Sequence, residues 1–157
     1  MNEQVVIRRA QLTDLDDILS IFERTVQQMS KDDYSEEEIR AWIGTQDKVD
    51  DWTQKINNEY FLVAHIEDEL VGFGGMKGDD QIDFIFTHHE YVNQGIASLV
   101  FDRMQSHAVE GGVQKLRSNV SKTGKHFFEQ RGFTILREQL QSFGDMELVN
   151  FEMEKEI

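Results

Sequence analysis

The chain has 157 residues, which is enough for one domain with a hydrophobic core and too few for two ordinary domains with separate cores. It has no cysteine, so disulfides, thiolate metal sites and a cysteine nucleophile are excluded. Thirty acidic against sixteen basic residues give a formal net charge of -14, which repels nucleic acid and anionic membranes. The first residues lack the apolar segment of a signal peptide, and no apolar run approaches the roughly 20 residues that span a bilayer. We therefore expect a single cytoplasmic domain over residues 1–157, without nucleic acid or membrane partners.

The first third of the chain predicts one strand followed by helices. Apolar residues recur at helical spacing behind Thr13, a candidate N-cap. Ser35 followed by Glu38 is a capping-box pattern that starts a second, shorter helix. A third helix is permitted by the spacing but not required. The predicted elements are a strand at 5–9, helices at 15–29 and from 36, and the optional helix at 48–58.

The remainder alternates strands and helices. Gly111-Gly112 and Gly132 are helix stop signals, and Gly144-Asp145 is a hairpin dipeptide. The predicted elements are a meander of strands at 60–66, 69–78 and 81–88, a helix at 96–107, a strand at 115–120, a helix at 122–131, and a strand pair at 133–143 and 146–154.

The segment DFIFTHHEYVNQGIAS, residues 83–98, joins an apolar strand to an amphipathic helix through a glycine-bearing loop. Unpaired backbone N–H groups and the positive end of the helix dipole meet where such a helix begins. A phosphate or pyrophosphate can dock there without a basic side chain. An ordinary strand-to-helix turn explains this segment equally well when it is taken alone.

A second segment, VSKTGKHFFEQRGF at residues 120–133, adds a strand, a turn, a helix and then Gly-Phe. Together the two segments resemble the acetyl-CoA core of the GNAT superfamily of N-acetyltransferases, and similarity extends from RRAQLTDLDDILSIFERTV to the closing NFEMEK strand. Among its members, bacterial ones without an assigned acceptor look closest. The resemblance implies an α/β (α+β) fold with a central mixed, mostly antiparallel, twisted sheet of about seven strands flanked by about four helices. By family analogy it also implies acetyl-CoA as co-substrate and a homodimer.

In the superfamily the strand before the loop pairs with the pantetheine arm, and the loop amides hold the pyrophosphate. The family loop reads Gln/Arg-Gly-x-Gly-Ile-Gly/Ala, whereas residues 92–97 here lack the leading Gln/Arg and the first glycine. Asn93 takes that glycine's place, and asparagine tolerates positive φ better than most residues. The expected CoA-binding residues are Ile85, Phe86, Thr87, Val92, Asn93, Gln94, Gly95, Ile96, Ala97, Ser98, Ser121 and Phe128. Lys125 and Arg131 are candidate phosphate contacts.

Phe128 stands where many members carry a Tyr that is placed to protonate the departing CoA thiolate. The standard general acid is therefore missing here. We expect Phe128 to form a wall of the pantetheine channel. Core packing of the helix explains Phe127 and Phe133 as well. The change keeps open a second hypothesis, a CoA-binding regulatory or catalytically degenerate GNAT-fold protein.

Acyl transfer needs a neutral amine, yet an alkylamine has a pKa of about 10, so a base is expected. Asp83 is the candidate general base, because alternation along the strand would put it on one face with Ile85 and Thr87, beside the thioester. An Asp that hydrogen-bonds loop backbone is the alternative. Backbone N–H groups near Phe86 and Thr87 are expected to polarise the thioester carbonyl.

Tyr34, Trp42 and Trp52 lie in the segment that covers the acceptor side in the family, where they could grip an amine by cation–π contact or simply anchor the core. The adjacent His88 and His89 are candidate metal ligands. However, the side chains of neighbouring residues on an extended chain point in opposite directions, and no HExxH spacing is present. We expect no metal.

The sequence therefore predicts an N-acetyltransferase in which a primary amine attacks acetyl-CoA directly. The acceptor can be a small molecule or a peptide amine, and the residues do not choose between them. A protein-interaction domain with an acidic face and no small ligand is the least favoured reading.

Overall fold

We describe a computed structural model of the protein over residues 4–44 and 48–157. The elements in chain order are β1 (Val5–Arg9), η1 (Leu12–Asp14), α1 (Leu15–Met29), α2 (Glu36–Ile43), α3 (Lys48–Asn58), β2 (Tyr60–Ile66), β3 (Glu69–Lys77), β4 (Gln81–Thr87), η2 (His89–Tyr91), α4 (Ile96–Glu110), β5 (Lys115–Ser121), α5 (Lys125–Gln130), β6 (Thr134–Phe143) and β7 (Met146–Glu156). The α/β class and the seven strands are confirmed. The described residues form five α-helices rather than about four, because 48–58 is a full helix. None of these helices is long and apolar enough to cross a bilayer.

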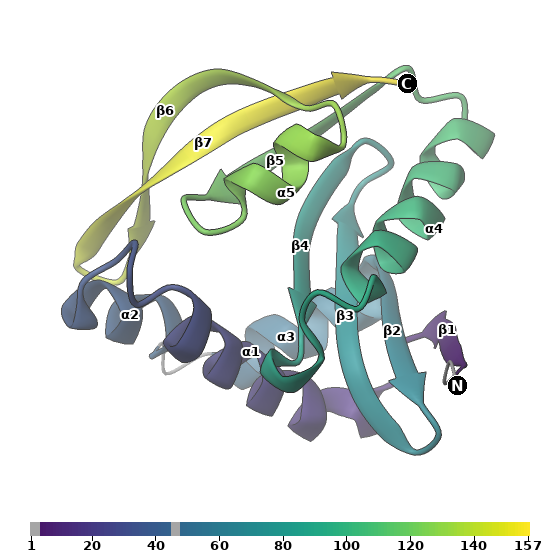
Figure 1. Ribbon diagram of the computed structural model, residues 1–157, viewed down its shortest axis with the longest axis horizontal. Coiled ribbons are helices and arrows are strands. Elements are labelled where there is room, and N and C mark those ends of the chain that lie inside the picture. The colour runs from purple at the N-terminus through teal and green to yellow at the C-terminus, as the bar shows by residue number, and fades with distance from the viewer. Residues whose placement is uncertain (1–3, 45–47) are drawn as a thin grey trace.

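The strands form one sheet in the order β1-β2-β3-β4-β5-β7-β6. Every neighbouring pair is antiparallel except β4 and β5, which run parallel. That parallel pair is joined at only two positions, Gln81 with Arg117 and Ile82 with Ser118. Beyond them the strands separate, so the sheet opens into two halves (Figure 1). The buried Ser118 hydroxyl donates to the Ile82 carbonyl at 2.8 Å, where the two strands part.

Helices cover both faces of the sheet. One core cluster packs α4 and α5 against the sheet, and a second packs α1, α2 and α3 against the other face. Glycines in β3 let α4 approach closely, since a Cβ on Gly74 would lie 2.8 Å from Val100 and one on Gly72 would lie 2.9 Å from Ile96. Figure 1 shows α4 in front of β3 and α2 beneath the β6–β7 hairpin. The first turn of α4 is thereby fixed beside β4.

The helix starts agree only partly with the sequence prediction. The capping box before α2 is confirmed, because Ser35 Oγ accepts from the Glu38 N–H at 3.1 Å and Glu38 accepts from the Ser35 N–H at 2.9 Å. Thr13 as N-cap of α1 is wrong, because it lies inside the η1 turn and Asp14 precedes the helix. The Asp14 carboxylate accepts from the Gln11 N–H and from Arg8 instead.

Candidate active site

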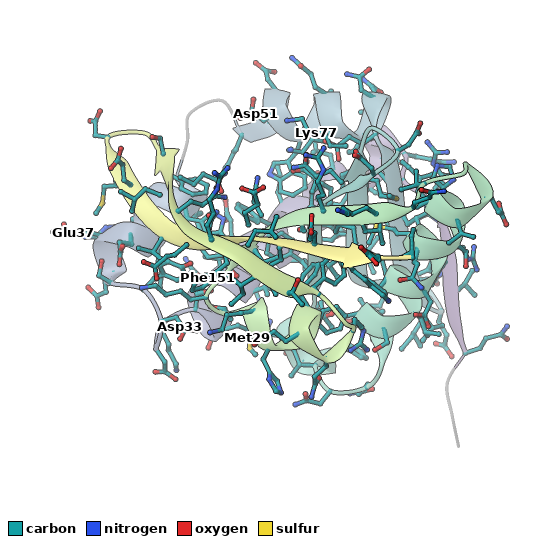
Figure 2. All side chains as sticks on the ribbon, turned by 90° about the horizontal axis from the view of Figure 1, so that it is seen from above. Met29, Asp33, Glu37, Asp51, Lys77 and Phe151 are labelled. Carbon is teal, nitrogen blue, oxygen red and sulfur yellow. The ribbon has the colours of Figure 1, made fainter. Side chains whose placement is uncertain are left out.

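The parting of β4 and β5 creates a cleft with two connected hollows of about 310 and 540 Å³. Met29 of α1 borders the larger hollow and Asp51 of α3 borders the smaller one, and Figure 2 shows them on opposite sides of the crossing strands β6 and β7. The hollows meet at residues that line both: Trp42, Ile85, Phe86, Ser121, Gly124 and Phe128. A long ligand can therefore enter one hollow and meet a second ligand from the other.

The larger hollow ends at the glycine loop before α4. Asn93 has φ 63°, so the prediction that it replaces a glycine in a left-handed conformation is confirmed. Gly95, with φ 81°, is the N-cap of α4 and makes no side-chain cap, which suits the binding of an anion at this helix start. The loop residues that line the hollow are Val92, Asn93, Gly95, Ile96, Ala97 and Ser98, whereas Gln94 is exposed and does not.

Arg131 adds a cation to this end of the cleft. Its guanidinium contacts Ser98 Oγ in the first turn of α4 and lies 4.0 Å above the Phe127 ring. Stacking and the hydroxyl contact hold the charge beside the helix start, where a phosphate would gain from it. Lys125, the other candidate, instead lies 5.0 Å over the Phe151 ring and does not line the hollow.

Phe128 borders both hollows at their junction. Only 7 % of it is exposed, and it packs edge-to-face on Phe101 and Phe133. His126, two residues earlier on α5, is exposed and lines the larger hollow but not the junction, so it does not take the place of the missing hydroxyl. The junction is therefore walled by a ring that has no proton to donate.

Asp83 lies in the smaller hollow, but not as alternation along a regular strand predicted. Phe84 pairs with Gly75 and Ile82 pairs with Met76, so Asp83 is an extra residue in a β-bulge. The bulge turns Asp83 towards α3, whereas Ile85 packs against the cluster that contains α4. The expectation that Asp83 shares a face with Ile85 is therefore wrong. The bulge adds one residue to β4 relative to β3, so the side chains of Asp83 and Phe84 no longer alternate between the two faces of the sheet.

The carboxylate of Asp83 is held by a side chain rather than by loop backbone. Lys55 Nζ donates to Asp83 Oδ2 at 2.6 Å and lies 3.6 Å from Glu59 Oε2. Burial disfavours the charged form of Lys55, but the hydrogen bond to Asp83 together with the negative charges of Asp83 and Glu59 outweighs this, so the pKa of Lys55 is raised. Burial and Asp83 together raise the pKa of Glu59 to about 8. Sequence reasoning missed Lys55 and Glu59, whose only local signal was their i, i+4 spacing.

The predicted acceptor-side aromatics differ in what they can offer. Tyr34 is 5 % exposed, its hydroxyl donates to the Val149 carbonyl at 2.6 Å, and it accepts from the Lys122 N–H at 2.9 Å. Burial raises its pKa. Trp42 is half-buried and lines both hollows, so its ring can contact a ligand. Trp52 is buried among phenylalanines and is a core anchor.

A wall of neutral amides faces this hollow from β5, β6 and β7. Asn150 donates to Gln141 Oε1, and Gln139 donates to Asn119 Oδ1 at 2.9 Å. Asn150 is 6 % exposed, and its Oδ1 has no hydrogen-bond partner among the described residues. A buried acceptor that lines a cleft without a partner is suited to a ligand donor. The sequence offered no sign of it, because the wall forms across three strands.

His88 and His89 stack with ring centroids 4.8 Å apart, so the expectation that they point oppositely is wrong. The strand ends at Thr87, and His88 begins the η2 turn, where its Nδ1 accepts from the Glu90 N–H at 3.1 Å. No group of three or more potential metal ligands occurs in residues 4–44 and 48–157.

Residues 30–155 match the family model described as Acetyltransferase (GNAT) domain. The chain belongs to this GNAT acetyltransferase family. It is also 30% identical over 137 residues to the uncharacterized N-acetyltransferase YafP of Escherichia coli K12, covering 86% of this chain and 85% of that protein.

Solved structures give the same fold. The GCN5-related N-acetyltransferase of Rhodopseudomonas palustris superposes with a TM-score of 0.95 at 26% identity, covering 100% of this chain and 99% of the other. The PaiA N-acetyltransferase of Thermoplasma acidophilum, solved in complex with coenzyme A, has a TM-score of 0.82 at 20% identity over 98% of this chain and 99% of its own. The GNAT fold and the acyltransferase class read from the two motifs are therefore confirmed.

Proposed function

We propose that this GNAT acetyltransferase transfers the acetyl group of acetyl-CoA to a primary amine by direct attack on the thioester. The observation that carries the proposal is the single cleft that connects the start of α4 with Asp83. The pyrophosphate would rest on the loop amides of Asn93 to Ser98 beside Arg131. The pantetheine arm would run along the open edge of β4 at Ile85 to Thr87, past Ser121 and Phe128.

At the junction of the hollows, backbone N–H groups near Phe86 and Thr87 would polarise the thioester carbonyl. The Thr87 carbonyl accepts from Thr25 Oγ1 at 2.9 Å, which anchors this end of β4 to α1. Asp83 would remove a proton from the amine. Binding both reactants in one cleft would supply much of the rate enhancement through proximity.

The acceptor would occupy the smaller hollow between Trp42 and the amide wall. Asn150 Oδ1 would accept a hydrogen bond from an N–H or O–H group of that amine. Entry of the acceptor from the Asp51 side, opposite to CoA, leaves the pantetheine path clear. A cytoplasmic location, a bacterial source and a homodimer stay predictions from the sequence.

The first test is calorimetric titration with acetyl-CoA and with CoA, followed by thiol release in the presence of a panel of amines. We expect micromolar binding and amine-dependent thiol release. Asp83→Asn should lower kcat by about 10²–10⁴-fold with unchanged affinity for acetyl-CoA. An unchanged kcat would remove Asp83 from the mechanism.

A second candidate function rests on Phe128. Because this ring stands where a general acid is usual and cannot donate a proton, the protein could bind CoA as a regulatory or degenerate member. That function predicts tight CoA binding without thiol release from any amine. The same titration and assay separate the two functions.

A further inference from the structure

Glu59, the residue between α3 and β2, has a carboxyl group in an unusual setting. Its side chain is 9 % exposed, and Oε1 is buried without a hydrogen-bond partner among the residues that the structure describes. Leaving a charged carboxylate oxygen unpaired away from water is costly. A proton on Glu59 would remove that cost and turn the carboxyl into a donor.

The surroundings of Glu59 are built to hold this group beside Asp83. Lys55 Nζ lies 3.6 Å from Glu59 Oε2 and 2.6 Å from Asp83 Oδ2, so one ammonium serves two carboxyl groups. Gly75 of β3 makes the room, because a Cβ there would lie 3.1 Å from Glu59 Oε1 and 2.4 Å from the Phe84 ring. Only glycine at this position accommodates both neighbours without displacement.

Lys55, Glu59 and Asp83 form a cluster in which one positive charge faces two negative charges when both carboxyl groups are ionised. Burial is the largest cause that raises the pKa of Glu59 to about 8, followed by the neighbouring Asp83, while Lys55 opposes the rise. The guanidinium of Arg9 lies nearby but donates to the backbone carbonyl of Glu59 at 3.3 Å, not to the carboxyl. With both carboxyl groups ionised, the cluster with Lys55 carries one net negative charge, and one proton on the pair makes it neutral.

We propose that Glu59 is a positioning residue that shares one proton with Asp83, so that the two carboxyl groups take up and release that proton as one unit. This inference rests on the proposed function of Asp83. While Glu59 holds the proton, its carboxyl is a donor that faces Asp83, which also accepts from Lys55. Once that proton is lost, two carboxylates face one ammonium, and the pair takes a proton readily from a substrate ammonium.

The reaction balances through this pair. The acceptor ammonium gives one proton to the Asp83–Glu59 pair, and its nitrogen then attacks the thioester carbon. The C–N bond forms and the C–S bond breaks, so that CoA leaves as a thiolate. The nitrogen loses its second proton to the thiolate, and the pair returns its proton to solvent. The products are the N-acetyl amine, CoA and one released proton.

The dependence of kcat/KM on pH tests the proposal. Wild-type kcat/KM should rise through about pH 8. Glu59→Gln replaces the acid with an amide that always donates, so the inflection near pH 8 should disappear and the rate near pH 9 should fall at least about tenfold.

Glu59→Asp should restore part of the inflection, because it keeps a titrating group. Glu110→Gln on the exposed end of α4 is the matched control and should behave as wild type. A Glu59→Gln profile identical to that of wild type would overturn the proposal.

A titration without substrate separates this proposal from the proposed function. Carboxyl carbon NMR of the ligand-free protein, assigned with Glu59→Gln, should show Glu59 titrating near pH 8, and Asp83→Asn should move that titration to lower pH. Titration of wild-type Glu59 in the ordinary carboxyl range would overturn the shared proton even if the enzyme is active. Failure of every amine to release thiol, with the titration near pH 8 intact, would reject the proposed function and leave the carboxyl pair supported.

Discussion

The hydroxyl of Tyr34 lies 2.6 Å from the carbonyl oxygen of Val149 and joins the segment after α1 to strand β7 across 115 residues of sequence. The same hydroxyl accepts from the Lys122 N–H at the end of β5. The hydroxyl therefore donates one hydrogen bond and accepts another, in both cases with the protein backbone. Tyr34 therefore joins the segment after α1 to the half of the sheet that contains β5 and β7.

Tyr34→Phe should destabilise the protein by about 2 kcal/mol, because a backbone donor and a backbone acceptor lose their partner. The melting temperature should fall by roughly 4–8 °C. Tyr60→Phe is the matched control, since the Tyr60 ring stacks on His107 and its hydroxyl makes no hydrogen bond within the described ranges. If Tyr34→Phe raised the acceptor KM at unchanged stability, Tyr34 would be a substrate contact instead.

The conformation of Asn93 makes a sharp prediction for CoA binding. Asn93→Gly should keep both stability and CoA affinity, because glycine adopts φ 63° without strain. Asn93→Val should cost about 1–2 kcal/mol, since a β-branched residue strongly disfavours this region, and it should weaken CoA binding measured by calorimetry. Gln94→Val, at the exposed neighbour without positive φ, is the control. Equal CoA affinity in Asn93→Val would show that the loop does not bind the pyrophosphate.

Phe128 gives a test of how the thiolate leaves. Phe128→Tyr adds a hydroxyl where the two hollows meet, and we expect kcat to rise by about tenfold if protonation of the thiolate limits turnover. Phe127→Tyr adds the same group on the side of the larger hollow alone and should leave kcat unchanged. Stopped-flow and steady-state thiol release would measure both. No gain in Phe128→Tyr would mean that another step limits the rate.

The Oδ1 of Asn150, which has no partner among the described residues, gives a test of where the acceptor amine binds. Asn150→Leu, of similar size but without a polar atom, should raise the acceptor KM by about tenfold and leave the Kd for CoA unchanged. Asn150→Asp keeps an oxygen at this position and should retain acceptor binding. Similar KM values for both variants and wild type would place the acceptor elsewhere in the cleft.

Local chemistry explains why much of this fold could be predicted from the sequence. Ser35 and Glu38 are three residues apart and cap each other, and Gly144 with φ 60° closes the β6–β7 hairpin at the predicted dipeptide. The positive φ of Asn93 followed from its side chain and its place in the loop. Each of these features depends on neighbours in the sequence, which is why a pattern of a few residues was sufficient.

The parts that could not be predicted depend on contacts between distant residues. The orientation of Asp83 is set by its register against β3, which no local pattern records. Lys55 meets Asp83 across 28 residues of sequence, and Glu59 joins them only because Gly75 leaves space. The proposed acceptor end of the cleft therefore depends on tertiary packing, whereas the proposed pyrophosphate site lies mainly in one continuous loop.

The ion pair between Arg8 and Asp14 makes the stability of the protein depend on pH. Arg8 donates to both carboxylate oxygens, at 2.8 and 2.9 Å, and this contact lowers the pKa of Asp14. A carboxyl whose pKa is lower when folded stabilises the protein above its unfolded pKa of about 3.9, and that contribution is lost as the pH falls through the folded value.

Urea unfolding at pH 7 should show Asp14→Asn less stable than wild type by about 2 kcal/mol. The difference should shrink below about pH 4, because wild-type Asp14 is then itself protonated. A difference that stays constant down to pH 3 would show that Arg8 does not stabilise the charge of Asp14, and exposed Asp50→Asn serves as the matched control.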